Sequence, residues 1–195
     1  TKHDIVQMAT GNAEKFLSDE ETRRSLMDEQ TLGAVEELGR YLGLKHPPRR
    51  MECFDISHNQ GQETVASMVV FEDGAPKKSD YRRFKIRSTE GKPDDFLSMR
   101  EVTTRRYVGL AEEKLPDLII IDGGKALEII RHAAGHKDVP VVGLAKQFEL
   151  VFTEGNPDPV ELPRRSQALY LIQRIRDEAH RFAITFHRKL RGKRN

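Results

Sequence analysis

The segment Met51-Glu52-Cys53-Phe54-Asp55-Ile56-Ser57 decides how this sequence is read, because it has the composition of a β-strand with an acid inside it. Aspartate is depleted in strands, and burying its charge is costly unless a partner compensates it. A second apolar run, Leu118 to Ile121, leads directly into Asp122. Two strands that each deliver a carboxylate to one end of a sheet predict a divalent-cation site. In the alternative, Asp55 caps a turn and Asp122 only ends a strand.

Length and composition are those of a globular protein. The chain has 195 residues, of which 37% are hydrophobic and 33% charged, enough for one domain with a sizeable core plus an extension. The apolar runs are short and no signal-peptide pattern opens the sequence, so it predicts no membrane span. The single cysteine, Cys53, excludes an internal disulfide and a cysteine-rich zinc site, which fits a cytoplasmic location. Because the sequence begins with Thr1, we expect it to be a piece of a longer protein.

The charge is distributed unevenly although the formal net charge is only +2. Residues 1–48 hold six Lys and Arg against nine Asp and Glu, whereas residues 164–195 hold ten against two. A basic end of this density predicts binding to a phosphate backbone. The alternative is a solvated helix end whose cations complement the helix dipole.

Residues 1–46 predict a helical extension, with apolar residues at roughly helical spacing among charges. Gly11-Asn12 and the stretch around Asp28 favour two or three shorter helices over one. Lys45-His46-Pro47-Pro48 then ends the helical pattern. We therefore predict a boundary here, between a linker without chemistry of its own (1–46) and the main domain (47–195).

The main domain alternates strand and helix patterns. We expect strands at 51–57, 64–71, 79–87, 118–121 and 139–144, a hairpin over 148–162, and helices at 94–108, 126–134 and from 166 to about 190. Phe96, Met99, Val102 and Tyr107 share one side of the first of these helices. Strands linked through helices should be parallel and buried. The fold class predicted is α/β, a ribonuclease H-like mixed sheet flanked by helices.

The last helix offers a third ligand. Its apolar residues recur every three or four positions, and Arg176, His180 and His187 lie together beside that stripe. An imidazole there is able to reach Asp55 and Asp122 if the helix crosses the sheet. Two carboxylates and one imidazole suit Mg²⁺ or Mn²⁺ that holds a phosphate and a water. His180 is equally able to act as a general acid or base.

The turn Gly123-Gly124-Lys125 has two interpretations. A strand followed by Gly-Gly-Lys and a helix resembles a nucleotide-phosphate turn, but the spacing of the P-loop is missing. As a tight turn that DNA approaches, with Lys125 on a phosphate, it agrees with the metal site. The sequence therefore predicts no small-molecule cofactor.

Four motifs resemble the C-terminal nuclease region of the UvrC family, the incision subunit of bacterial nucleotide excision repair. In chain order they are Glu52-Cys53-Phe54-Asp55-Ile56-Ser57-His58, Ser98-Met99-Arg100-Glu101-Val102, Pro116-Asp117-Leu118-Ile119-Ile120-Ile121-Asp122-Gly123-Gly124-Lys125 and Arg174-Ile175-Arg176-Asp177-Glu178-Ala179-His180-Arg181-Phe182-Ala183-Ile184-Thr185-Phe186-His187. The resemblance implies a ribonuclease H-like fold with an Asp-Asp-His triad at Asp55, Asp122 and His180. It also implies the 5′ incision, made after UvrA and UvrB present the damage.

The sequence departs from that family in three ways. The family's N-terminal nuclease domain is absent, so we expect no 3′ cut. The helix-hairpin-helix pair that follows in the family is also absent, so we expect weak DNA binding by this chain alone. After Lys125 the chain reads Ala-Leu-Glu where the family usually has Gly-Gln-Leu.

Two hypotheses follow. The first is a divalent-metal endonuclease domain with Asp55, Asp122 and His180 as metal ligands and catalytic residues. Its expected DNA contacts are Lys125, Arg176, His187 and Arg188. The second is a non-catalytic module that binds nucleic acid or a partner and only retains the fold. The presence of both aspartates together with His180 favours the first.

Overall fold

The computed structural model describes residues 2–58, 63–88, 94–123, 138–145 and 150–192, with side chains as far as residue 185. The described helices are α1 (Lys2–Asp28), the π-helix η1 (Glu29–Gly33), α2 (Ala34–Tyr41), α3 (Asp95–Tyr107) and α5 (Gln167–Gly192), with short 3₁₀ turns η2 (Lys78–Asp80) and η3 (Glu112–Lys114). The strands are β1 (Arg50–His58), β2 (Thr64–Glu72), β3 (Ala75–Pro76), β4 (Arg82–Lys85), β5 (Leu118–Asp122), β6 (Val141–Leu144), β7 (Leu150–Thr153) and β8 (Val160–Glu161).

The eight strands of the described residues form one mixed sheet. Its order is β3-β2-β1-β5-β6-β7-β8, and β4 also pairs with β2. The strands β1, β5 and β6 run parallel to one another, whereas β2, β7 and β8 pair antiparallel to their neighbours. The Val and Ile runs of the central strands are buried because helices cover the sheet. The predicted mixed α/β sheet with flanking helices is confirmed.

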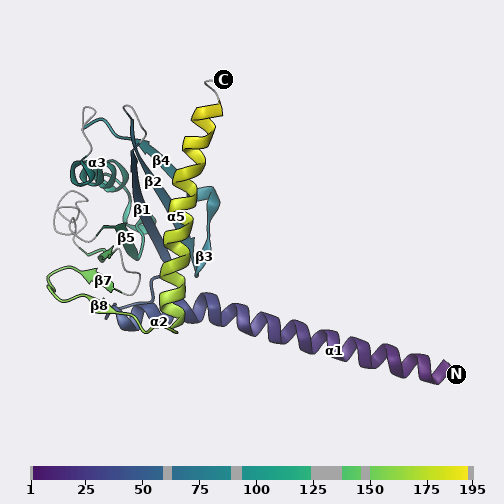
Figure 1. Cartoon of the computed structure of the whole chain (residues 1–195). Helices are drawn as coiled ribbons and strands as arrows, with labels where there is room; N and C mark the ends of the chain where they lie inside the picture. Colours follow the sequence, from purple (N-terminus) through teal and green to yellow (C-terminus); the bar gives the residue numbers. More distant parts are fainter. Residues whose placement is uncertain (1, 59–62, 89–93, 124–137, 146–149, 193–195) are drawn as a thin grey trace.

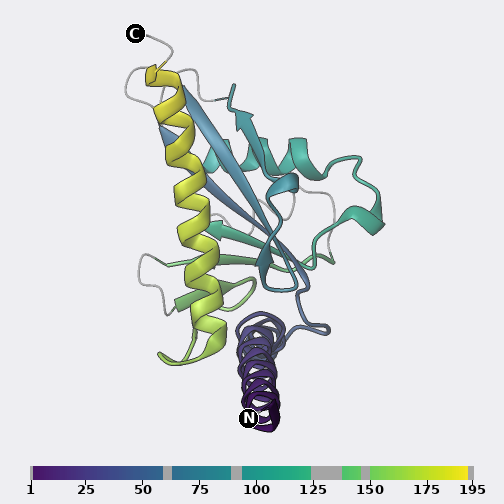
Figure 2. The same cartoon turned by 90° about the vertical axis from the view of Figure 1, so that its right-hand side faces the viewer.

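Alternation along β1 sends side chains to opposite faces of the sheet. Asp55 points to α5, and Glu52 points to α3. Figures 1 and 2 show α5, drawn in yellow, running along one face and α3 lying behind the other. Each face of β1 therefore carries one buried acid, and each acid is held by a different helix.

The N-terminal arm differs only in part from the prediction of two or three shorter helices, because the change around Asp28 is present and the break at Gly11-Asn12 is not. Helix α1 is a single helix that continues through Gly11, and the chain passes at Glu29–Gly33 through a π-helical turn into α2. Figure 1 shows α1, in purple, extending away from the rest of the protein. Nothing is buried on α1, whereas the apolar side of α2 belongs to the core. Core packing thus begins before residue 47, and the boundary between 46 and 47 stays a prediction.

Close contacts fix the junction between the arm and the sheet. The Arg174 guanidinium donates to the Gln30 carbonyl at 2.6 Å and to the Gly74 carbonyl at 3.3 Å. Gly74 ends the β2–β3 turn with φ 80°, and a Cβ at this position would lie 2.5 Å from the Thr31 carbonyl oxygen. Glycine is required there both for its left-handed backbone and for the close approach of the π-helix.

Two predicted elements differ in detail from the structure, and a third is not tested. The strand expected at 79–87 is shorter, because η2 occupies Lys78–Asp80 before β4 begins. Helix α3 begins as predicted, with the Asp94 carboxylate accepting from two backbone N–H groups, but Phe96 in its first turn is 37% exposed and is not in the core. The helix expected at 126–134 lies outside the described residues.

Candidate metal centre

Two adjacent parallel strands place Asp55 and Asp122 side by side. Phe54 of β1 pairs with Ile121 of β5, so the next residue of each strand is an aspartate at the same level. Residues at the same level of neighbouring strands point to the same face. Both carboxylates therefore lie on the face that α5 covers, at the level where β5 ends beside the second half of β1.

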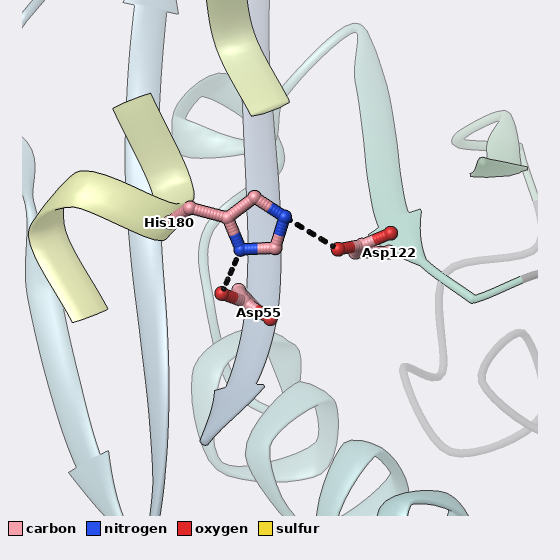
Figure 3. A group of neighbouring side chains, drawn as sticks. All are labelled: Asp55, Asp122 and His180. Atoms are coloured by element: carbon pink, nitrogen blue, oxygen red, sulfur yellow. Dashed lines mark hydrogen bonds and ion pairs between the residues drawn. The ribbon is translucent and has the colours of Figure 1, made fainter. Parts of the chain in front are cut away.

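Helix α5 supplies the third group. Leu169, Ile172 and Ile175 are buried against the sheet, which fixes the rotation of the helix. This rotation directs His180 at both acids, with its Nδ1 2.9 Å from Asp55 Oδ2 and its Nε2 3.2 Å from Asp122 Oδ2. Figure 3 shows the imidazole standing between the two carboxylates. The contact at Nδ1 is a hydrogen bond with Asp55.

The donor atoms fit a single small cation. Asp55, Asp122 and His180 each offer one ligand atom, and these atoms lie within 4.8 Å of one another. Atoms that ligate one ion at about 2.0 to 2.6 Å lie no more than about 5 Å apart. Two carboxylates held this close also need positive charge between them. The group is therefore able to hold a divalent metal ion.

A buried hydroxyl next to Asp55 supports this fit. Ser67 on β2 pairs directly with Asp55 in the antiparallel register, so both side chains are on the α5 face. Ser67 is fully buried, and its Oγ has no hydrogen-bond partner among the described residues. A buried hydroxyl without a partner is costly. A water held at the site, or a carboxylate oxygen of Asp55 turned towards β2, would satisfy it.

Burial also raises the pKa of the Asp55 carboxyl above its usual value. The positive charge and the hydrogen bond of His180 oppose this rise, and the Asp122 carboxylate adds to it. The thiol of Cys53, two residues before Asp55, is buried as well, and its pKa is raised for the same reason. This end of β1 thus disfavours negative charge unless a cation is present.

Arg176 contacts the site itself. It is only 9% exposed, and its Nη2 lies 3.2 Å from Asp122 Oδ1 while its Nη1 donates to the Ala145 carbonyl at 3.1 Å. The sequence predicts Arg176 on the same helix flank as His180, but as a contact to DNA. The four-residue spacing between Arg176 and His180 could have predicted this contact, because a residue one turn away on the same flank also reaches the acids.

The remaining predicted residues are not placed. Lys125 lies outside the described residues, and the side chains of His187 and Arg188 lie beyond the described part of α5. Their contacts with DNA stay predictions. No helix within the described ranges has both the length and the apolar composition needed to cross a membrane.

A sequence model described as the UvrC RNase H endonuclease domain matches residues 39–184, which is most of the chain. The chain therefore belongs to the UvrC ribonuclease H endonuclease domain family.

Curated relatives agree with this family. The UvrABC system protein C of Gemmatimonas aurantiaca is 51% identical over 196 residues, and that of Salinibacter ruber is 46% identical over 202 residues. These alignments cover 97% and 99% of this chain and 32% of each relative. The chain thus spans about a third of the length of the relatives that it matches.

Solved structures of endonuclease V resemble the chain more distantly. The Bacillus subtilis enzyme gives a TM-score of 0.38 with 15% identity, covering 72% of this chain and 81% of that one. Human endonuclease V gives a TM-score of 0.35 with 19% identity, covering 51% of this chain and 46% of that one.

Proposed function

We propose that this domain hydrolyses DNA phosphodiester bonds with Mg²⁺ or Mn²⁺ bound by Asp55, Asp122 and His180, and that it makes the 5′ incision of nucleotide excision repair. The convergence of the three donor atoms within 4.8 Å, in a chain of the UvrC endonuclease family, carries this proposal. The relatives named UvrABC system protein C are the reason for choosing nucleotide excision repair.

The residues of the site have different roles in the proposed reaction. When bound, the ion neutralises phosphate oxygens and lowers the pKa of the attacking water. Asp55 and Asp122 would hold the ion on the α5 face. His180 either completes the ligand set or transfers a proton at Nδ1 or Nε2, whichever nitrogen is free of the carboxylates when substrate is present. Burial of the sheet side of the site limits competing water.

Substrate and partners belong to the same proposal. We expect the duplex to reach the site along the basic C-terminal part of α5, with Lys125, His187 and Arg188 on phosphates. UvrB, with UvrA acting earlier, is the expected partner of the full-length protein and supplies the choice of lesion. The cytoplasm, where the chromosome is, is the expected location.

The direct test is nicking by this chain alone. The protein should convert supercoiled plasmid to the nicked form when Mn²⁺ is added, and EDTA should stop the reaction. Matched duplexes with and without a bulky adduct should be cut equally, because the partners that choose the lesion are missing. No nicking with Mn²⁺ or Mg²⁺, even at high protein concentration, would favour the non-catalytic binding module instead.

Metal binding should also stabilise the fold. At a hundredfold excess over its Kd, Mn²⁺ adds about 2.7 kcal/mol to the free energy of unfolding, which for a domain of this size raises the Tm by about 5 to 10 °C. A thermal scan of the protein with and without Mn²⁺ measures this rise. The variant Asp122→Asn should lose most of it. An equal rise in that variant would place the ion elsewhere.

DNA binding should depend strongly on salt. Contacts to phosphates release counterions, so log K falls linearly with the logarithm of the salt concentration. We expect Kd values at or above the non-specific range of about 10⁻⁴ to 10⁻⁶ M at physiological salt, with little sequence preference. Fluorescence anisotropy between 50 and 200 mM salt, on two unrelated duplexes with the metal omitted, measures both properties. Binding that does not change with salt would contradict phosphate contacts.

A further inference from the structure

We infer that Arg176 is a positioning residue for Asp122 rather than a contact to DNA phosphate. This inference rests on the proposed function, because it concerns how the same site is held ready for a metal ion. It replaces the role that the sequence suggested for Arg176. The inference follows from where the guanidinium lies and from how little of it reaches solvent.

The guanidinium of Arg176 makes its contacts within the protein. One terminal nitrogen donates to the Ala145 carbonyl just after β6, and the other pairs with Asp122 at the end of β5. The side chain of Arg176 is 10% exposed, and that of Asp122 is 15% exposed. A phosphate contact would require the guanidinium to leave a partly buried carboxylate, which is costly when the partner stays unpaired.

The contact also orients the carboxylate. Arg176 pairs with Oδ1 of Asp122, and the other oxygen, Oδ2, lies 3.2 Å from His180 Nε2. The last torsion of an aspartate side chain is broad, so an unheld carboxylate rotates readily. With Oδ1 occupied, Oδ2 stays directed at the centre shared with Asp55 and His180.

Helix α5 carries both Arg176, which orients Asp122, and His180, which faces both acids. Arg176 and His180 are four residues apart, so they are stacked one turn apart on the same flank. The Arg176 contacts to the ends of two strands fix the helix at the level where His180 meets both acids. Arg176 also places a permanent positive charge beside the site. This charge repels a metal cation and therefore lowers the affinity of the site for the metal.

The test uses Arg176→Gln and Arg176→Lys, with Arg181→Gln as the matched control. Arg181 is on the same helix and also pairs with an acid, Glu178, but it is exposed. In metal-binding titrations without DNA, Arg176→Gln should bind Mn²⁺ about tenfold more tightly because the competing charge is lost. Its cleavage rate at saturating Mn²⁺ should fall at least about tenfold because Asp122 is no longer oriented. Arg176→Lys keeps the charge but lacks the two guanidinium nitrogens that contact Ala145 and Asp122 together. This variant should bind Mn²⁺ like the wild type and cleave more slowly.

A double-mutant cycle without metal tests the coupling by itself. If Arg176 serves Asp122, the Tm losses of Arg176→Gln and Asp122→Asn should add to more than the loss of the double variant. This readout does not depend on activity, so it separates failure of this inference from failure of the proposed nuclease.

Two results would overturn the inference. In the first, the Tm losses of Arg176→Gln and Asp122→Asn add up to the loss of the double variant, and the Mn²⁺ affinity of Arg176→Gln is unchanged. Arg176 would then have a purely structural role. The second is weaker DNA binding with a shallower salt dependence in Arg176→Gln while its cleavage rate at saturating DNA is unchanged. That pattern is expected of a phosphate contact.

Discussion

The variant Asp122→Asn should retain the fold and lose metal-dependent nicking. The amide has nearly the shape of the carboxylate but lacks the charge that holds a cation. Loss of outer-shell partners of metal ligands alone costs 10- to 100-fold, so we expect a fall of at least about a hundredfold for a ligand itself. Initial rates of plasmid nicking at saturating Mn²⁺ measure the effect.

Asp117→Asn provides the matched control. Asp117 is one residue before β5, is exposed, and uses its carboxylate to accept the Arg50 N–H. An amide oxygen accepts the same hydrogen bond, so this variant should nick at the wild-type rate. Wild-type nicking by Asp122→Asn would contradict the proposed metal site.

The structure also changes what we expect for the stability of Asp122→Asn. Two neighbouring carboxylates repel each other, so the sequence suggests a gain in stability when one charge is removed. In the structure His180 lies between the acids and Arg176 pairs with Asp122. Because these partners already offset the repulsion, we expect no gain in the Tm without metal.

The second large effect concerns stability and lies on the opposite face of the sheet. Glu52 is fully buried there. Its carboxylate accepts from Arg106 at 2.8 Å, from the Tyr107 hydroxyl at 2.6 Å and from Arg50 at 3.1 Å. These bonds fix the end of α3 to β1, and the buried Tyr107 ring packs edge-on to Phe54. The cluster thus holds β1, and through it Asp55, between two helices.

Glu52→Gln should destabilise the protein by about 3 to 5 kcal/mol, because it leaves the largely buried Arg106 guanidinium without its anion, whereas Arg50 keeps its pair with Asp80. Tyr107→Phe should cost about 1.5 to 3 kcal/mol, since the hydrogen bond from its hydroxyl to the charged Glu52 is lost. Urea unfolding followed by circular dichroism measures both values. The control is Glu63→Gln, which makes the same change in an exposed pair with Lys85 and should cost no more than about 1 kcal/mol. Equal losses for Glu52→Gln and Glu63→Gln would contradict this account.

Features that depend on neighbours along the chain were predictable from the sequence. The apolar run of β1 has an acid inside it and that of β5 ends in one, Asp94 is a good N-cap, and α5 has a regular apolar stripe. These signals arise within one turn or one strand, where periodicity and capping act. They were sufficient for the mixed sheet and for selecting Asp55, Asp122 and His180. The roles of these three residues stay predictions until they are tested.

Features that depend on contacts between distant residues were decided only by the tertiary structure. Arg176 reads as a surface cation until α5 is placed against β5 and β6, and Glu52 reads as a poor strand residue until Arg106 and Tyr107 come to meet it. The π-helical turn at Glu29–Gly33 likewise meets its partner Arg174, 144 residues further along the sequence, only in the folded chain. The physical reason is that a buried charge is tolerated only beside its partner, and residues far apart in sequence become partners only when the chain folds.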